Sequence, residues 1–206
     1  MRLLVGLGNP GPEYARNRHN VGFMAADEIV RRHDFSAFRG GKFQGELAEG
    51  VLGGRKILIL KPMTYMNESG RSVHSCATFY RIAPEDIVVM HDELDLAGGK
   101  VRMKRGGGHA GHNGLRSIHA HLGEAYGRVR IGIGHPGDKA RVKGYVLKDF
   151  SRAEMAWVEP MIDSIADNAT YLAENDDARF QSRVAEDIRP VLEEIAAREA
   201  RQKENG

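Results

Sequence analysis

The sequence contains one cysteine, Cys76, in 206 residues, and it has no long apolar run. A single cysteine excludes an internal disulfide and a zinc site built from several cysteines. No stretch approaches the ~18 consecutive apolar residues that span a bilayer. The apolar run near the N-terminus is short and ends in glycine and proline, so we expect neither a membrane segment nor a signal peptide. A reducing, cytoplasmic location is the simplest expectation.

Aromatic residues are also few, at 7%, but the remaining composition is that of a globular protein. Hydrophobic residues make up 41% of the chain and charged residues 28%, close to the usual averages. These values exclude a disordered or collagen-like chain. A chain of this length is long enough to bury a substantial core.

Acidic residues are scarce in one region of the chain. Residues 96–148 contain eleven Lys or Arg and only Glu124 and Asp138, together with five of the nine histidines. Residues 151–206, by contrast, contain thirteen acidic and seven basic residues. The basic region fits a solvated surface. Because its basic residues interleave with glycines and histidines, a phosphate-binding surface is an equal alternative.

Short apolar runs alternate with segments of helical periodicity along the chain. The predicted strands are 3–7, 43–52, 56–60, 87–91, 100–104 and 129–133, and the predicted helices are 21–32, 70–80, 113–121, 151–172 with a kink at Pro160, and 188–200. Alternation of this kind predicts a single α/β domain with a mixed, mostly parallel sheet flanked by helices. We place the domain at residues 1–185 and a C-terminal amphipathic, charged extension at 186–206.

The segment GLGNPG (residues 6–11) follows a predicted strand and formally matches a dinucleotide-binding fingerprint. That fingerprint requires a helix to open at the glycines. Here Pro10 and Pro12 interrupt the segment, so we favour a strand-to-loop turn that presents Asn9 and Tyr14 at the sheet edge.

Two further segments contain residues suited to acid–base chemistry. His19 lies in the polar segment RHNVG before a predicted helix, and its unperturbed pKa suits a base near neutrality. Asp92 follows the apolar run VVM, at the carboxyl end of a predicted buried strand. A surface histidine and a turn carboxylate are the simpler alternatives. If the two side chains meet, Asp92 would fix the tautomer of His19.

The glycine-rich segment GGGHAGHNG (residues 106–114) allows close approach by another chain. Asn113 begins a predicted helix, and it is either an N-cap or a substrate contact. The pair His109 and His112 suggests a metal site only weakly, because no third ligand lies at suitable spacing.

In KPMTYMNESG (residues 61–70), Asn67 is a plausible helix cap. Tyr65 and Met66, if exposed, would form a platform for a base or a peptide backbone.

The nucleophile is expected to be water. The chain has no Gly-x-Ser-x-Gly motif, and Cys76 lies within a predicted helix on its buried face. His19 would then activate water, while the asparagines at 9, 67 and 113 orient it and polarise a carbonyl. This combination suits hydrolysis of an activated ester.

Taken together, these segments make the chain resemble the bacterial peptidyl-tRNA hydrolase family. The matching motifs, in order, are VGLGNPGPEY, RHNVG, KPMTYMNESG, VMHDELDL, GGGHAGHNGLRSI, RIGIGHPG and YVLKDF. The resemblance implies a monomeric, metal-free and cofactor-free enzyme with a twisted mixed sheet. It also implies cleavage of the ester between a peptide and the 3′-terminal ribose of tRNA, which recycles tRNA from prematurely released peptidyl-tRNA.

The resemblance also implies a role for each matching residue. His19 would be the base and Asp92 its partner, and Asn9 would help to distinguish N-blocked from free aminoacyl-tRNA. The substrate and tRNA contacts would be Tyr14, Tyr65, Met66, Asn67, Asn113, Arg102, Lys104 and Arg130. Two departures from the family pattern are the long segment after residue 186 and the side chains at Tyr65 and Glu68.

Two other functions remain as alternatives. A non-catalytic RNA-binding protein would keep the basic region but could lose the candidate catalytic residues. All of those histidine, aspartate and asparagine residues are present here, which favours the enzyme. A nicotinamide-dependent oxidoreductase would rest on residues 6–11 alone.

Overall fold

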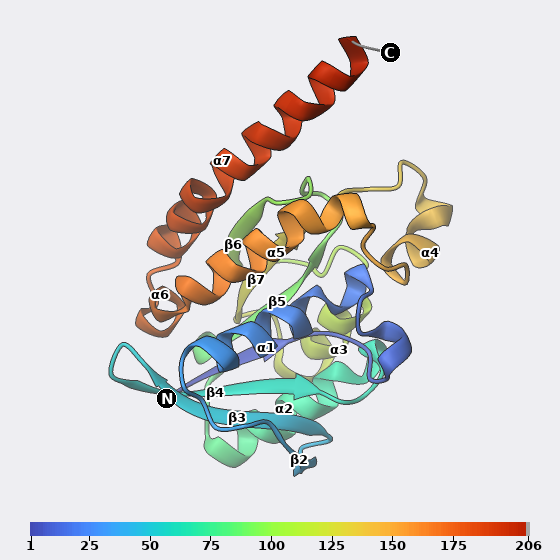
Figure 1. Ribbon diagram of the computed structural model, residues 1–206. Coiled ribbons are helices and arrows are strands. Elements are labelled where there is room, and N and C mark those ends of the chain that lie inside the picture. The colour runs from blue at the N-terminus through green and yellow to red at the C-terminus, as the bar shows by residue number, and fades with distance from the viewer. Residues whose placement is uncertain (205–206) are drawn as a thin grey trace.

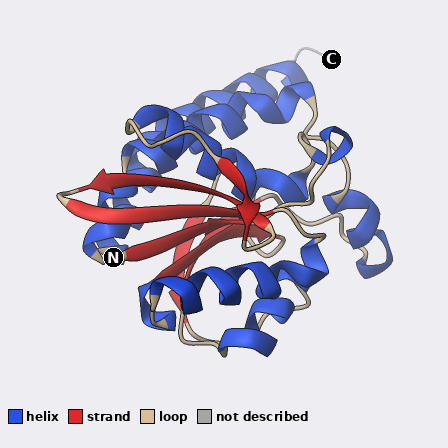
Figure 2. Cartoon of the chain, turned by 90° about the horizontal axis from the view of Figure 1, so that it is seen from below, coloured by secondary structure: helices blue, strands red, loops and turns tan. Residues whose placement is uncertain are grey.

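The computed structural model describes residues 1–204, whose strands form one seven-stranded sheet with helices on both faces (Figure 1, Figure 2). The strand order is β2-β3-β4-β1-β5-β7-β6. The strands are β1 (Arg2–Gly6), β2 (Arg39–Lys42), β3 (Gly45–Leu52), β4 (Arg55–Pro62), β5 (Ile87–Glu93), β6 (Val101–Arg105) and β7 (Gly127–Gly132). A single α/β domain with a mixed sheet is therefore confirmed.

Parallel pairing is confined to the centre of the sheet. Strands β4, β1, β5 and β7 pair in parallel, whereas β2–β3, β3–β4 and β6–β7 are antiparallel. The fraction of strand pairs that are parallel is thus smaller than the mostly parallel sheet that the sequence suggested. Strand β2 was not predicted, because its sequence RGGK has no apolar pattern and all four residues are exposed.

The helices are α1 (Val21–Arg32), α2 (Ser69–Tyr80), α3 (Asn113–Leu122), α4 (Val142–Val146), α5 (Arg152–Asp167), α6 (Ala169–Glu174) and α7 (Asp177–Glu204). The first three agree with the sequence to within one residue at each end. The helix predicted over 151–172 is two helices separated at Asn168, and Pro160 lies inside the first of them. The predicted capping box of Ser151 and Glu154 begins α5.

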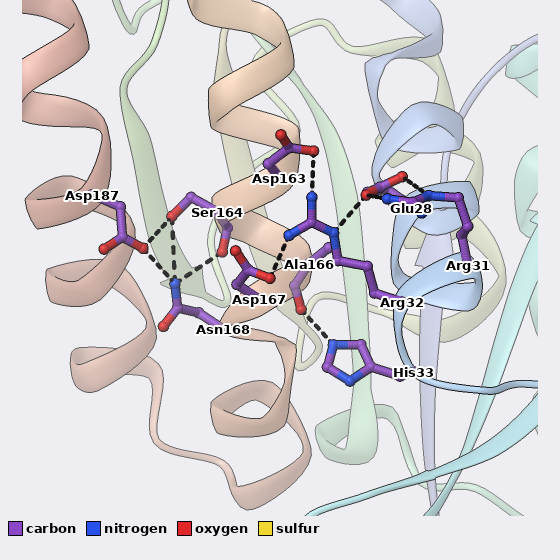
Figure 3. A network of polar contacts seen from close by, with 10 residues as sticks. All are labelled: Glu28, Arg31, Arg32, His33, Asp163, Ser164, Ala166, Asp167, Asn168 and Asp187. Carbon is purple, nitrogen blue, oxygen red and sulfur yellow. Dashed lines mark hydrogen bonds and ion pairs between the residues drawn. The ribbon is translucent and has the colours of Figure 1, made fainter.

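Helix α7 begins well before residue 188, and the expected boundary between residues 185 and 186 falls inside it. Val184 and Ile188 are both buried in the core. The Asp187 carboxylate accepts hydrogen bonds from the Ser164 hydroxyl at 2.7 Å and the Asn168 amide at 2.9 Å (Figure 3). The start of the extension therefore packs on the domain, whereas the last turns of α7 extend away from it and are exposed from residue 196 to 204 (Figure 1).

A second polar network joins α1 to α5 (Figure 3). Arg32 pairs with Glu28 at 2.6 Å on its own helix and with Asp163 at 2.7 Å and Asp167 on α5. His33 donates from Nε2 to the Ala166 carbonyl at 2.6 Å. Single exposed ion pairs stabilise little. Together, these contacts join the end of α1, a helix that begins two residues after His19, to α5.

Two glycines bring the start of α1 against the sheet. A Cβ on Gly22 would lie 2.3 Å from the Met90 carbonyl oxygen and 2.5 Å from the Leu7 nitrogen, and one on Gly6 would lie 2.3 Å from the Gly22 carbonyl oxygen. No side chain fits at such distances. The approach allows Leu7 to accept a hydrogen bond from Phe23 at 3.1 Å. It places the residues before α1 beside the carboxyl ends of β1 and β5.

The core has one layer on each face of the sheet. One cluster packs α1, α5 and α7 on β1, β4, β5 and β7, and the other packs α2 and α3 on the opposite face. Among residues 1–204, no helix combines the length and hydropathy that a bilayer crossing requires.

Candidate active site

A cavity of about 760 Å³ opens where β1 and β5 end. Ligands of open α/β sheets bind at the carboxyl ends of parallel strands. The predicted site residues that line this cavity are Asn9, His19, Tyr65, Met66, Asn67, Asp92 and Asn113. The other predicted site residues lie outside its lining, and these are Tyr14, Arg102, Lys104 and Arg130.

His19 and Asp92 are in contact, although 73 residues separate them along the chain. The Nδ1 atom of His19 lies 2.9 Å from both carboxylate oxygens of Asp92, and both residues are buried. Because a carboxylate only accepts hydrogen bonds, the proton of neutral His19 lies on Nδ1 and the lone pair lies on Nε2. Burial lowers the pKa of His19. The charge of Asp92 and its hydrogen bond together raise this pKa by more than burial lowers it, so the net shift is upward.

His112 is a second donor to the same carboxylate. Its Nδ1 atom accepts hydrogen bonds from the backbone of Gly114 at 3.1 Å and of Leu115 at 3.3 Å, which makes His112 the N-cap of α3. The proton therefore lies on Nε2, which donates to Asp92 at 2.9 Å. Burial raises the pKa of Asp92, but His19 and His112 lower it well below its usual range. Asn113 is the first residue of α3, as expected, and His112 rather than Asn113 is the N-cap, so the N-cap alternative for Asn113 is excluded.

The donor atoms of His19, Asp92 and His112 all lie within 4.8 Å of one another, and among residues 1–204 they are the group whose spacing could suit a metal ion. The tautomer of His112 does not fit that use. Its Nε2 atom carries a proton, and freeing the lone pair would place the proton on Nδ1, where it would oppose two backbone donors. The arrangement instead favours a hydrogen-bonded His–Asp–His group.

His91 lies beneath this group and is fully buried. Its Nδ1 atom donates to the Asp92 carbonyl oxygen at 2.7 Å, and its ring lies 5.1 Å from that of His112. Burial, with His112 adding to it, lowers the pKa of His91 to about 3. His91 is therefore neutral, and it fixes the backbone that carries Asp92.

Asn9 is held by three hydrogen bonds. Its backbone exchanges two with the Asn20 side chain, at 3.0 and 2.9 Å, and its Oδ1 accepts from the Met66 backbone at 2.8 Å. The acceptor end of the Asn9 amide is thus occupied, which leaves the Nδ2 donor for the cavity that Asn9 lines.

The segment before α2 forms another part of the lining. Asn67 belongs to the 3-10 turn Met66–Glu68, and the N-cap of α2 is Glu68, so the prediction of Asn67 as a cap is wrong. Asn67 is exposed, and Tyr65 has 61% of its surface exposed, whereas Met66 is buried. Met66 is therefore not part of an exposed platform, and Tyr65 and Asn67 are the exposed side chains of this part of the lining.

Tyr14 ends a 3-10 turn, Pro12–Tyr14, and is half-buried. The same turn shows whether the glycine motif of residues 6–11 has the geometry of a dinucleotide-binding site. No α-helix opens there, because α1 begins only at Val21. The dinucleotide geometry is absent at this strand end.

The predicted basic contacts lie on the outer strands of the sheet. Arg102 faces Arg130 across β6 and β7, and Lys104 faces Arg128 in the same register, so all four share one face. Arg102 and Lys104 are exposed, and Arg130 pairs with Glu93 at 2.9 Å. Buried Arg128 donates to the carbonyls of Gly106, Gly107 and Gly108. It thereby shapes the glycine loop that leads to His112.

Comparison with known proteins identifies the family. The family model described as peptidyl-tRNA hydrolase matches residues 3–191. The chain belongs to the peptidyl-tRNA hydrolase family. It is 62% identical to the peptidyl-tRNA hydrolase of Parvibaculum lavamentivorans over 194 residues, covering 94% of each chain. It is 59% identical to that of Paracoccus denitrificans over 191 residues, covering 93% of this chain and 81% of the relative.

Solved structures agree with the resemblance seen in the sequence. The crystal structure of peptidyl-tRNA hydrolase from Acinetobacter baumannii superposes with a TM-score of 0.85 at 43% identity, covering 89% of this chain and 94% of that one. The predicted family and fold class are confirmed.

Sequence reasoning missed several residues of the site. His112 was considered only as a metal ligand, and Asn20 was not singled out although it follows His19. The basic rim residues Arg116, Lys139 and Lys143 line the cavity and were noted only as part of the charge bias. The recurring histidines of residues 91–112 were the available signal, but sequence could not show which carboxylate they share.

Proposed function

We propose that this member of the peptidyl-tRNA hydrolase family cleaves the ester between a peptide, or an N-blocked amino acid, and the 3′-terminal ribose of tRNA. The contact between His19 and Asp92 at the strand ends is the observation that best supports this reaction. It supplies an oriented base at a cavity large enough for the acylated end of the substrate.

In the proposed mechanism, water is the nucleophile. The Nε2 atom of His19 takes a proton from water, and the resulting hydroxide attacks the ester carbonyl. Asp92 holds the Nδ1 proton and stabilises the imidazolium that forms. The tetrahedral intermediate then expels the ribose oxygen, which receives the proton back from His19. General-base assistance of this kind contributes ~10²–10⁴-fold.

The asparagine amides are the proposed donors to the developing oxyanion. Asn9 offers Nδ2, while Asn67 and Asn113 line the same cavity. In the glycine loop, the N–H groups of Gly111 and His112 already donate to His109, so these two groups do not serve the oxyanion in the proposal.

The basic strands are the proposed tRNA contact. Arg102, Lys104 and Arg130 share one face of β6 and β7, and Arg130 pairs with Glu93, which lines the cavity. Lys and Arg on such a face bind phosphates. Tyr14 and Tyr65 are proposed to contact the acceptor end. An exposed aromatic ring offers a stacking surface to a terminal base.

We also propose that the protein acts as a monomer in the cytoplasm, and that only the exposed end of α7, residues 196–204, is an appendage to the catalytic domain. A reducing compartment keeps the buried thiol of Cys76 free. Light scattering behind size-exclusion chromatography tests the monomer, whose mass is 22.8 kDa.

The direct test compares release of N-acetyl-aminoacyl groups from tRNA with release of unblocked aminoacyl groups, using wild type and His19→Ala. Wild type should cleave the blocked ester selectively, and His19→Ala should lose ~10²–10⁴-fold in kcat while its affinity for tRNA stays within a few-fold. Near-normal turnover by His19→Ala would remove His19 as the base. A folded wild type that binds tRNA without cleaving it would support the RNA-binding alternative.

A further inference from the structure

Arg18, the residue before His19, is buried, and its guanidinium donates hydrogen bonds to a carboxylate and to backbone carbonyls. It exposes only 7% of its surface. Its guanidinium donates to the Glu154 carboxylate at 2.6 and 2.9 Å, and to the backbone carbonyls of Lys148 at 3.3 Å and Asp149 at 3.1 Å. None of these contacts belongs to the His–Asp–His group.

The same guanidinium also holds the carboxyl end of α4. It donates to the Tyr145 carbonyl at 3.3 Å, and its central carbon lies 4.3 Å from the centre of the Tyr145 ring. The Arg18 backbone donates to the Lys148 carbonyl at 3.0 Å. Glu154, in turn, is fixed as the third residue of the α5 capping box. Arg18 therefore connects the segment of His19 to both α4 and the start of α5.

The segment that Arg18 holds forms one wall of the cavity. Within residues 139–147, which we call the α4 segment, the lining includes the apolar side chains of Val142, Val146 and Leu147. Helix α4 has five residues, too few to be stable in isolation. Its position must come from tertiary contacts, and one of these is the hydrogen bond from Arg18 to the Tyr145 carbonyl.

We propose that Arg18 is a positioning residue that places the apolar wall of the α4 segment opposite His19, and that this wall receives the peptide carried by the tRNA. The proposal rests on the proposed function, because it assigns the peptide part of that substrate to this wall. Arginine is suited to the role, since its planar donors serve the carboxylate and several carbonyls at once. Lysine, a point charge with three donors, cannot replace all of them.

The first experiment is amide hydrogen exchange of peptides covering residues 139–148 in wild type, Arg18→Gln and Arg18→Lys. Arg31→Gln is the matched control, because Arg31 makes a bidentate pair with Glu28 on the exposed side of α1. We expect exchange in this segment to rise ~10-fold or more in Arg18→Gln, to rise less in Arg18→Lys, and to stay unchanged in the control.

The second experiment measures kcat and KM for N-acetyl-aminoacyl-tRNA and for an N-acetyl-tripeptidyl-tRNA. In Arg18→Gln, KM should rise more for the tripeptidyl substrate than for the shorter one, with kcat changed only a few-fold and affinity for uncharged tRNA unchanged. Arg18→Lys should recover part of the loss. A purely structural defect would impair hydrolysis of both substrates equally, so the change in KM would not depend on peptide length.

Unchanged exchange in residues 139–148 of folded Arg18→Gln would overturn the positioning role. An equal KM change for both substrates would overturn the assignment of the wall to the peptide. If Arg18→Gln does not fold, Glu154→Gln is judged by the same criteria, since it removes the charge partner and keeps the side-chain size. Failure of wild type to cleave either ester would refute the proposed function, whereas the exchange result would still decide whether Arg18 holds the segment.

Discussion

Replacing Asp92 with asparagine tests the geometry of the site most directly. The carboxylate accepts one N–H from His19 and one from His112, each at 2.9 Å. An amide offers an oxygen at one end and an NH2 donor at the other. Because backbone donors hold the tautomer of His112, we expect the amide oxygen to face His112 and the NH2 group to face His19. Because Nδ1 of His19 lies 2.9 Å from both carboxylate positions, the NH2 group would oppose a proton on Nδ1. It would favour the tautomer that carries its proton on Nε2, where the lone pair of the base is needed.

The expected fall in kcat of Asp92→Asn follows from the loss of general-base catalysis. The wrong tautomer removes the general-base contribution, ~10²–10⁴-fold in kcat, which corresponds to ~3–5 kcal/mol of transition-state stabilisation. The pH dependence should change as well. The raised pKa of His19 means that wild type loses activity as the pH falls through that value, because the base becomes protonated. Without the Asp92 charge, burial alone remains and lowers the pKa. The residual activity of Asp92→Asn should therefore persist to lower pH.

The assay is hydrolysis of N-acetyl-aminoacyl-tRNA under kcat and kcat/KM conditions between pH 5 and 8.5. Asp86→Asn is the control, since Asp86 lies before the other end of β5 and pairs with Arg2. Thermal unfolding and tRNA affinity establish that both variants are folded and bind substrate. A loss of less than about threefold in Asp92→Asn, or an acid limb that does not move, would refute the assignment of Asp92 as the partner that sets the tautomer.

Three other perturbations test separate features. Lys104→Gln should weaken tRNA binding and flatten the dependence of log K on log salt by ~1; an unaltered slope in binding titrations would remove Lys104 from the phosphate contacts. Gly22→Ala should lower the free energy of unfolding by ~1–3 kcal/mol or more, because its Cβ would overlap the Met90 carbonyl. Gly144→Ala is the control, since open space surrounds Gly144, and it should be neutral or stabilising in thermal unfolding. Truncation after Ile195 should leave Tm and turnover unchanged, because residues 196–204 are exposed; a large fall in Tm would show that these turns stabilise the domain.

The sequence determined the local structure where the local signal was strong. The apolar periodicity of residues 21–32 predicted α1 at its observed bounds, and the Ser151 and Glu154 pair predicted the start of α5. Local signals failed where they were short or polar. Strand β2 has no apolar pattern, and α4 is a helix of only five residues. The residues of α7 before 188 were missed, although Phe180 and Val184 are buried.

The candidate site divides in the same way. The motifs around His19, Asp92 and the asparagines could be recognised from the sequence, because each is a compact run of polar residues at the end of a predicted helix or strand. Glu68 and His112 occupy the N-cap positions of α2 and α3, so the cap expected at Asn67 is wrong and the cap alternative at Asn113 is excluded. A cap depends on which residue adopts the extended or bridging backbone, and neighbouring polar residues compete for it.

The sequence by itself determined which chemistry the chain contains: a histidine, an aspartate and amides at strand ends, with a basic region and a single cysteine. Only the tertiary structure decided how these groups are connected. It placed His112 as well as His19 on Asp92, fixed their tautomers, and set Arg18 behind the cavity wall. The physical reason is that each of these contacts joins residues 20 to 127 positions apart, and no local propensity encodes such pairs. The contact between His19 and Asp92 depends in addition on the close packing of α1 against β1 and β5, which two glycines permit.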